Sequence, residues 1–264
     1  MIPRADITAW RSESPWINDA QVEQDLLISR ALVDLFSNKH LADALAFRGG
    51  TALHKLFLQP AARYSEDIDL VQISGGPIGA TLDDIHKVLD PWLGTPVNKR
   101  SEDSVTLTYK VDSEIPPIIS LRLKIEINTR EHFAVFGLMK KDFKITTRWF
   151  EGDCKITTYE LNELLGTKLR ALYQRRKGRD LFDLWLGITL GKGHPKKIVE
   201  SFKHYMEKEG TKVSSKEFQT NLDLKMVHKG FLADISPLIR PEIEYDAKVA
   251  YELVSKKVIP FIED

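Results

Sequence analysis

The chain has 264 residues, of which 42% are hydrophobic and 29% are charged, and its 38 basic side chains are balanced by 38 acidic ones. This is the composition of an ordinary globular protein, long enough to form one large domain or two small ones. The zero net charge excludes a protein that binds nucleic acid through its overall charge, but it is compatible with a local basic patch. The single cysteine, Cys154, excludes an internal disulfide framework, and no apolar run approaches the roughly 20 residues of a membrane span. A cytoplasmic location is therefore expected.

The first part of the chain is predicted to alternate helices and strands. Apolar residues recur at helical spacing between residues 20 and 45, and further helices are expected over 51–58 and 81–93. Strands are expected where apolar and polar residues alternate, over 65–73, 104–111 and 120–128. Residues 132–157 are expected to add a hairpin or short strands.

From residue 157 onward the pattern becomes helical. Thr157 and Glu160 match the capping box that opens a helix, and leucines then recur at helical spacing as far as Leu172. Helices are expected to dominate from there to residue 264. The predicted organisation is a mixed α/β domain over residues 1–155, including the N-terminal helices, followed by a helical domain over residues 156–264.

A glycine pair followed by a threonine opens the most informative segment, FRGGTALHKLFLQPAARYSEDIDLV. Gly49 and Gly50 have no side chain to keep a phosphate away from their backbone N–H groups, and the Thr51 hydroxyl is a further donor. The helix expected after this turn would direct its free N–H groups toward an anion. An ordinary tight turn is the alternative interpretation, because glycine is equally common there.

Two aspartates, Asp67 and Asp69, lie near the end of the same segment. In a strand they share one face, while Ile68 and Leu70 share the other. Neighbouring carboxylates repel each other, so a fold that retains both commonly provides a cation, and oxygen ligands with a phosphate nearby favour Mg²⁺. The pattern predicts metal-assisted phosphate chemistry. Two solvated carboxylates on an edge strand are the alternative.

A lysine in the leucine stripe of the next predicted helix is a further candidate. Lys168 lies between Leu165 and Leu172, and an unpaired ammonium on an inward face is costly to bury. A triphosphate would compensate its charge, whereas a lysine that reaches the edge of the core needs no ligand. Six basic residues and no acidic one occur from Lys168 to Arg179. Such a run is typical of a solvated helix face or of a surface that contacts a phosphate backbone.

Three sequence blocks carry a resemblance to known proteins. They are FRGGTAL with R-x-SEDIDL, RLKIEINTRE over residues 122–131, and ELLGTKLRALYQRRKGRDLFDLW over residues 163–185. The first block closely resembles the glycine turn and Asp-x-Asp strand of nucleotidyltransferases of the DNA polymerase beta superfamily. All three, in this order, resemble the AbiEii/AbiGii toxins of bacterial type IV toxin–antitoxin systems, and together they span the central part of the chain.

The resemblance implies a fold and a set of site residues. The fold is α+β, with a polymerase-beta-like nucleotidyltransferase core that contains a mixed sheet and a helical C-terminal part that completes the active site. The implied metal ligands are Asp67, Asp69 and Glu126, and the implied catalytic residues are these three together with Lys168 and Asp180. The implied nucleotide-binding residues are Gly49, Gly50, Thr51, Lys168 and Arg179. The residues alone leave Glu126 open, because Lys124 or Arg122 could pair with it on the surface.

The function implied by the resemblance is transfer of a nucleotide from an NTP, with Mg²⁺ or Mn²⁺, to the 3′ end of a tRNA, so that translation is blocked. A basic cluster, Arg175, Arg176 and Lys177, is then expected to contact the RNA backbone. The resemblance also implies a cognate antitoxin, which need not bind the toxin directly. Two alternatives remain: a nucleotidyltransferase that modifies a protein or a small molecule, and a non-catalytic nucleotide-binding module.

Overall fold

A computed structural model describes residues 2–263. Its internal contacts divide the chain into two compact units, Met1–Tyr159 and Glu160–Asp264. The boundary predicted near residue 155 lies within a strand, β7 (Glu151–Tyr159), whose last residues pair with two other strands of the first unit.

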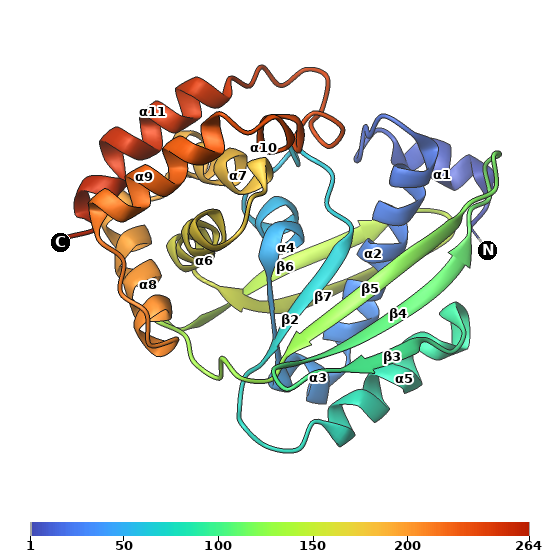
Figure 1. Cartoon of the computed structure of the whole chain (residues 1–264). Helices are drawn as coiled ribbons and strands as arrows, with labels where there is room; N and C mark the ends of the chain where they lie inside the picture. Colours follow the sequence, from blue (N-terminus) through green and yellow to red (C-terminus); the bar gives the residue numbers. More distant parts are fainter. Residues whose placement is uncertain (1, 264) are drawn as a thin grey trace. The chain divides into compact units, whose positions relative to one another are not determined.

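The first unit is built on one seven-stranded sheet with the order β3-β4-β5-β2-β1-β7-β6 (Figure 1). The strands are β1 (Leu45–Arg48), β2 (Asp67–Gln72), β3 (Val97–Arg100), β4 (Ser104–Asp112), β5 (Ser120–Asn128), β6 (Leu138–Thr146) and β7. Two pairings, β1 with β7 and β2 with β5, are parallel and the others are antiparallel. The sheet is therefore mixed, and the predicted α+β class is confirmed.

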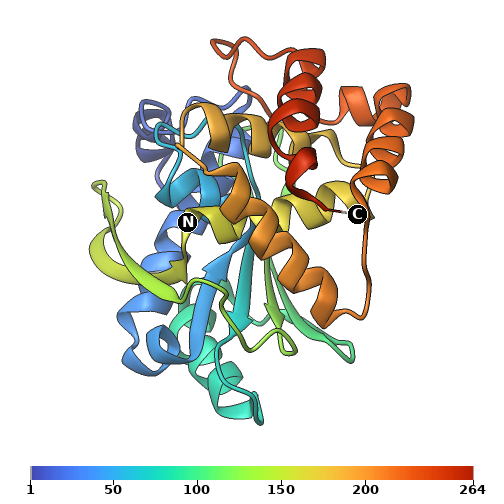
Figure 2. The same ribbon diagram turned by 90° about the vertical axis from the view of Figure 1, so that its left-hand side faces the viewer.

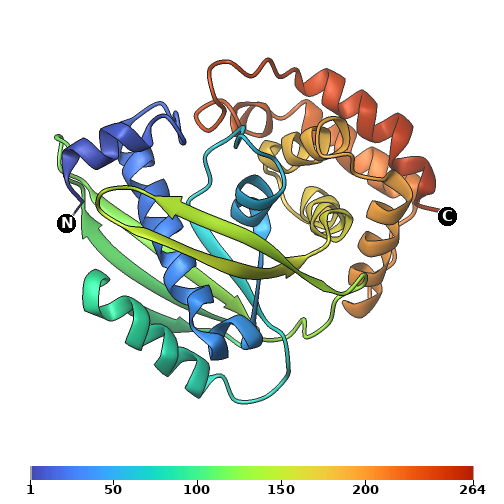
Figure 3. The same ribbon diagram turned by 180° about the vertical axis from the view of Figure 1, so that it is seen from behind.

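Helices cover the apolar face of this sheet. They are α2 (Asp19–Ser37), α3 (Lys39–Ala44), α4 (Gly49–Leu56) and α5 (Gly79–Leu93), while α1 (Arg4–Trp10) packs against α2. The sheet curves around α2, which contacts β5 on one side and β6 and β7 on the other (Figures 1 and 3). Helix α2 is long because apolar residues face the sheet on most of its turns, and Asn18 caps its first turn.

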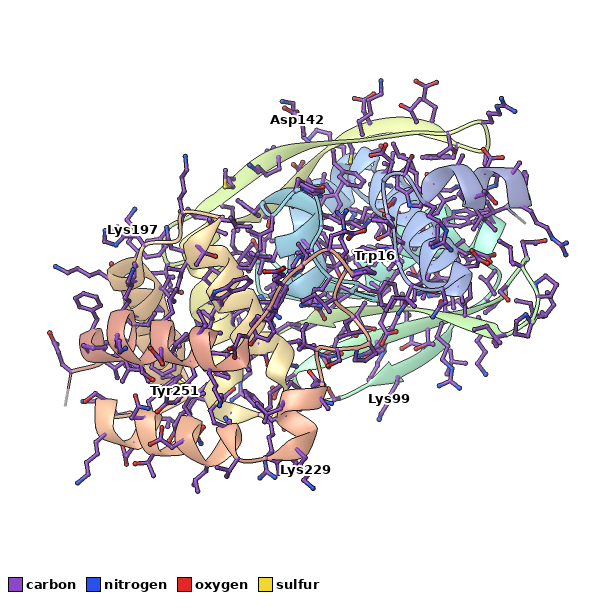
Figure 4. The ribbon with its side chains drawn as sticks, turned by 90° about the horizontal axis from the view of Figure 1, so that it is seen from above. Trp16, Lys99, Asp142, Lys197, Lys229 and Tyr251 are labelled. Atoms are coloured by element: carbon purple, nitrogen blue, oxygen red, sulfur yellow. The ribbon has the colours of Figure 1, made fainter. Side chains whose placement is uncertain are left out.

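The hairpin expected over residues 132–157 is present as β6 and β7 (Figure 2). Its turn is attached to α1, where one oxygen of Asp6 accepts hydrogen bonds from the backbone N–H groups of Arg148 and Trp149. Lys99 on β3 and Asp142 on β6 belong to the two edge strands and extend away from the ribbon (Figure 4). Charged side chains of this kind are a common protection of sheet edges.

Two strands were not predicted. Strand β1 has only four residues, LAFR, and a short apolar run cannot be distinguished from the end of a helix by periodicity. Strand β3, VNKR, is exposed at every position and so has no apolar alternation. Strand β1 matters most for the site, because it lies between β2 and β7 and its last residue leads directly into α4.

The second unit is helical. It consists of α6 (Leu161–Gln174), α7 (Gly178–Thr189), α8 (Pro195–Lys208), α9 (Ser215–Met226), α10 (Lys229–Ala233), α11 (Ala247–Lys257) and a 3₁₀ turn, η1 (Ile259–Phe261). Helices α6 and α8 pack closely at Gly166, where a Cβ would lie 2.5 Å from the Ser201 hydroxyl oxygen. Helices α9 and α11 are joined by a hydrogen bond from the Tyr251 hydroxyl to Asp223 (Figure 4). No helix within residues 2–263 has the length and apolar character needed to cross a membrane.

Candidate active site

The three candidate carboxylates of the first unit lie on two neighbouring parallel strands. The residues of β2 alternate, so Ile68 and Leu70 are buried while Asp67 and Asp69 are partly exposed on the opposite face. The register between β2 and β5 places Glu126 directly beside Asp69. Partners in neighbouring strands lie close enough for their side chains to interact. The polar face of the sheet thus brings together Asp67, Asp69 and Glu126.

One cation is already present among these carboxylates. Lys124 Nζ lies 2.7 Å from Glu126 Oε2, and both side chains are partly exposed. Burial by itself lowers the pKa of Lys124. The hydrogen bond to Glu126 and the charges of Asp67, Glu126 and Asp69 outweigh burial, so this pKa lies above its ordinary value. The ammonium is therefore held charged next to the acidic group.

The glycine turn contacts the carboxylates directly. Strand β1 ends at Arg48, which is opposite Asp69 in the antiparallel register, and Gly49 then begins α4 with φ +82°. A Cβ at residue 49 would lie 2.0 Å from Asp69 Oδ2. Glycine is required here both for the left-handed backbone and for the space that the carboxylate occupies.

The Thr51 side chain has a structural role inside the unit. It is 1% exposed, and its hydroxyl forms hydrogen bonds of 2.9 Å with the Ser65 hydroxyl and 2.5 Å with the backbone carbonyl of Asp67. This differs from the expected phosphate contact. A threonine hydroxyl has one hydrogen to donate, and here that hydrogen is used to join α4 to the start of β2.

Two basic residues near the turn form ion pairs within the same unit. Arg48 pairs with Glu131. Lys55 Nζ lies 3.0 Å from Asp25 Oδ1 and also donates to the Ser29 hydroxyl. The Lys55 and Asp25 side chains are 9% and 5% exposed, so this lysine attaches α4 to α2 and is not an ordinary surface residue.

The carboxylates of this unit fit a hard divalent cation that is coordinated both by protein oxygens and by a phosphate. Among residues 2–263, no group of three histidine, cysteine, aspartate or glutamate side chains is gathered tightly enough to hold a metal alone. Asp67 and Asp69 nevertheless provide two carboxylates on one face, and Gly49 has no side chain that would displace the Asp69 carboxylate. Mg²⁺ is commonly held in proteins by one or two carboxylates together with substrate phosphates.

In the second unit, Lys168 is the centre of a buried charge cluster. Its Nζ lies 2.9 Å from Asp183 Oδ2 and 3.3 Å from Asp180 Oδ1. The lysine side chain is 8% exposed and both aspartates are fully buried. The two aspartates are three residues apart on α7 and therefore share the face that meets α6. The unusual position of Lys168 in the leucine stripe is thus explained within the unit by two carboxylates.

Arg175 belongs to the same cluster. Its Nε and Nη2 donate to the two oxygens of Asp180, at 2.7 and 2.8 Å. Burial alone would raise the pKa of Asp180, but the charge of Lys168 and the hydrogen bonds and charge of Arg175 outweigh it and lower this pKa. Arg175 was expected to contact RNA. Its guanidinium is instead engaged by a bidentate pair within the protein, a strong and specific geometry.

The remaining predicted basic residues have looser contacts than Arg175. Arg176 is exposed. Lys177 Nζ lies 3.6 Å from Asp234, and Arg179 Nε lies 4.0 Å from the same carboxylate. The backbone N–H of Arg179 also donates to Asp234. Pairs this long and this exposed contribute little to stability, so these three side chains are available for other contacts.

Two basic residues close to these groups were not assigned from the sequence. Arg63 is 3% exposed, and its guanidinium lies against Gly50. Lys225 is 6% exposed, donates to the backbone carbonyls of Leu172 and Tyr173 at the end of α6, and has its pKa lowered by burial to about 8. The arginine of R-x-SEDIDL was visible as part of a motif, whereas nothing in the sequence around Lys225 indicates burial.

Solved structures with a similar fold include two that match almost the whole chain. JHP933 from Helicobacter pylori is 16% identical and has a TM-score of 0.56, and the match covers 93% of this chain and 92% of that one. MenT4, a nucleotidyltransferase toxin from Mycobacterium tuberculosis, is 15% identical with a TM-score of 0.57, over 99% of this chain and 90% of that one. At these identities the likeness concerns the fold. No curated protein matches the sequence significantly.

The sequence also matches a family described as nucleotidyl transferase AbiEii toxin, type IV TA system, over residues 30–252. The match includes the glycine turn, the carboxylates of β2 and β5, and the buried cluster of α6 and α7. It extends well beyond half of the chain and thus shows the family as well as the fold. The chain belongs to the AbiEii nucleotidyltransferase toxins of type IV toxin–antitoxin systems.

Proposed function

We propose that this protein transfers a nucleotide from an NTP to the 3′ end of a tRNA and thereby blocks translation. The observation that supports the chemistry is the placement of Asp67 and Asp69 on one face of β2, with Asp69 against the Gly49 turn and Glu126 beside it. The tRNA acceptor rests on the family resemblance. A cognate antitoxin, which need not bind the toxin directly, is proposed on the same basis, and a cytosolic location is proposed from the single cysteine and the lack of a long apolar run.

The proposed reaction is an in-line displacement at the α-phosphorus of the NTP. The acceptor hydroxyl oxygen forms a bond to phosphorus, the bond from phosphorus to the bridging oxygen of pyrophosphate breaks, and pyrophosphate leaves. The hydroxyl proton passes to the Glu126 carboxylate, the general base in this scheme. Backbone N–H groups at the glycine turn and the start of α4 hold phosphate oxygens.

Asp67, Asp69 and Glu126 would hold Mg²⁺ or Mn²⁺. The ion would supply charge neutralisation and orientation of the phosphates. We propose that Lys124 orients the Glu126 carboxylate before substrate arrives, because the two groups form a 2.7 Å ion pair. Glu126 must leave this pair, or share it, in order to accept a proton.

The roles proposed for the second unit rest on the resemblance and on its charge cluster. Lys168 and Asp180 are the proposed catalytic residues, and Arg179 is a proposed nucleotide contact. Lys168 and Arg175 carry two positive charges against the two negative charges of Asp180 and Asp183. The cluster is therefore close to neutral, and Lys168 would have to exchange an aspartate for a phosphate in order to bind a nucleotide.

The decisive experiment incubates the purified protein with total RNA and each of the four α-labelled NTPs in turn, with Mg²⁺ and with excess EDTA. Label should enter tRNA with one or more NTPs and be absent in EDTA. Mass spectrometry of the labelled tRNA would locate the added nucleotide. Label in protein or in a small molecule would favour the alternative acceptors. NTP binding without any transfer would favour the non-catalytic module, and full transfer in EDTA would contradict the metal assignment.

A further inference from the structure

We propose that Arg63 is a positioning residue of the triphosphate site, and that Gly50 must be glycine in order to accommodate it. The inference rests on the proposed nucleotidyl transfer and deepens it. Arg63 lies in the segment between α4 and β2, and it is 3% exposed. A Cβ on residue 50 would lie 2.4 Å from Arg63 Nη2 and 3.4 Å from its Cζ. The guanidinium therefore fills the space next to the second glycine of the turn.

The two glycines are required for different reasons. Gly49 has φ +82°, a backbone that favours glycine whatever its neighbours. Gly50 lies inside the first turn of α4 and is not among the residues with positive φ, so its backbone would accept an alanine. A side chain at residue 50 would meet the Arg63 guanidinium first, at 2.4 Å, and the Ser65 hydroxyl oxygen next, at 3.1 Å.

The guanidinium is not free to move aside. An exposed arginine could accommodate a new methyl group by a change of rotamer, at little cost. Arg63 is buried, and its Nη1 donates a 2.9 Å hydrogen bond to the backbone carbonyl of Tyr64. A methyl group at residue 50 would therefore shift either the guanidinium or the start of α4.

A second contact, next to that of Arg63, joins α4 to the segment that leads into β2. The Thr51 hydroxyl joins the next residue of α4 to Ser65 and to the Asp67 carbonyl. The turn that faces the phosphates and the strand that carries the carboxylates are thus joined at two consecutive residues. The planar guanidinium fixes this separation more rigidly than a flexible ammonium would.

The charge of Arg63 also suits an anionic ligand. The N-terminal turn of a helix carries a partial positive charge, so a cation placed there is unfavourable for the helix by itself. A triphosphate bound at the start of α4 would interact favourably with both. Arg63 therefore acts on the phosphates through the turn that it supports.

The test compares Gly50→Ala, Arg63→Ala, Arg63→Lys and the double variant Gly50→Ala with Arg63→Ala. Steady-state KM for the NTP, kcat and Tm are measured for each. Gly50→Ala and Arg63→Ala should each raise KM about tenfold, the loss expected for one charge-assisted contact, with a much smaller change in kcat. The double variant should be no worse than either single one, because both changes disturb the same contact. Arg63→Lys should retain part of the affinity.

Gly79→Ala is the matched control. Gly79 also begins a helix, α5, its φ is not positive, and a Cβ there would meet nothing within 4 Å. It should leave KM, kcat and Tm unchanged. If Arg63→Ala fails to fold, Gly50→Ala and Arg63→Lys test the same contact. A wild-type KM in both, or KM factors that multiply in a folded double variant, would overturn the inference. Absence of transfer by the wild-type protein would instead contradict the proposed function.

Discussion

Asp69 Oδ2 lies 2.0 Å from the place where residue 49 would have its Cβ, so its carboxylate is in direct contact with Gly49. The contact arises because β1 pairs antiparallel with β2, which places Arg48 opposite Asp69 and the turn immediately beyond it. One short antiparallel pairing thus brings the glycine turn against the strand that carries Asp67 and Asp69. A ligand that contacts both the glycine turn and the carboxylates must be compatible with backbone N–H groups and with negative charge, as a metal-bound phosphate is.

Asp67→Asn and Asp69→Asn should each abolish nucleotide transfer while the fold is retained. Both side chains are partly exposed on the polar face of β2, so neither change disturbs the apolar core. Charge stabilisation by a bound metal is worth several kcal/mol, which corresponds to a loss of at least about a hundredfold in rate. Transfer from an α-labelled NTP and thermal unfolding are the two measurements.

The matched control for this pair is Asp142→Asn. Asp142 lies on edge strand β6 of the same sheet, and its side chain is 87% exposed in an ion pair with Lys155. The control should keep wild-type transfer and unfolding. Near wild-type transfer by Asp67→Asn or Asp69→Asn would remove that residue from the metal site.

Lys168→Met should lower both stability and activity, and a second substitution can separate the two effects. Removal of the ammonium leaves two buried carboxylates without their shared partner, a loss of about 3–5 kcal/mol for a typical buried pair. Adding Asp183→Asn removes one of these charges and should restore part of the Tm. If Lys168 has a catalytic role, transfer stays absent in the restored double variant.

A different result for the double variant would contradict a catalytic role for Lys168. Transfer that returns in parallel with Tm in the double variant would show that Lys168 only neutralises Asp180 and Asp183. Each assay has to be run at a temperature at which circular dichroism shows the variant to be folded. Otherwise the unfolded fraction would be mistaken for a catalytic defect.

The parts of the site that could be predicted are those that depend on local pattern. The alternation in β2 predicted that Asp67 and Asp69 share a face, and the alternation in β5 placed Glu126 on its polar face. The pairing of these two strands is parallel and joins residues more than fifty positions apart, and no local pattern specifies that register. The short strand β1, which fixes the glycine turn against Asp69, has too few residues to show any periodicity.

Side-chain pairs were the least predictable feature. Arg175 was interpreted as part of a basic surface because it follows a helix in a run of positive residues. Its two hydrogen bonds to Asp180 depend on the angle at which α7 returns. The burial of Lys55 likewise depends on a partner elsewhere in the fold, Asp25 of α2. Such partners are set by the tertiary fold, so composition and spacing do not reveal them.

Neutralising Arg176 and Lys177 together should weaken RNA binding and reduce its dependence on salt. Arg176 is exposed and Lys177 has only a 3.6 Å contact with Asp234, whereas Arg175 is excluded from the set because it holds Asp180. Each phosphate contact that is lost reduces the slope of log K against log salt by about 0.7–0.9. The measurement is tRNA binding between low and moderate salt for the Arg176→Gln, Lys177→Gln variant.

The control for this variant is Lys229→Gln with Lys248→Gln, two exposed lysines of the same unit. It removes the same charge from other parts of the surface. NTP binding should be unchanged in both proteins. An equal change of slope in the two variants would show that the effect is one of overall charge, and no change in either would leave the basic run as a solvated helix end.

Lys225 should make the second unit more stable as the pH rises from about 8 to about 10.5. Burial lowers its pKa from 10.5 to about 8, with the charge of Arg176 acting in the same direction and that of Asp180 opposing it. In this window the unfolded chain holds the lysine proton that the folded protein has released, so the free energy of unfolding increases with pH. Below about pH 8 both states are protonated and the cost of burying the ammonium is fully present.

The measurement for Lys225 is the difference in unfolding free energy between the wild-type protein and Lys225→Met, from denaturant titrations at several pH values. The difference removes the tyrosine titrations common to both proteins, such as that of Tyr245, whose pKa is raised by burial. Methionine cannot donate to the Leu172 and Tyr173 carbonyls, and unsatisfied buried acceptors cost about 1–3 kcal/mol. The free energy of unfolding of the wild-type protein, relative to that of Lys225→Met, should therefore increase steadily above about pH 8. A difference that is constant from pH 7 to pH 10 would mean that Lys225 stays protonated in the folded protein, with its charge compensated by the α6 carbonyls and Asp180.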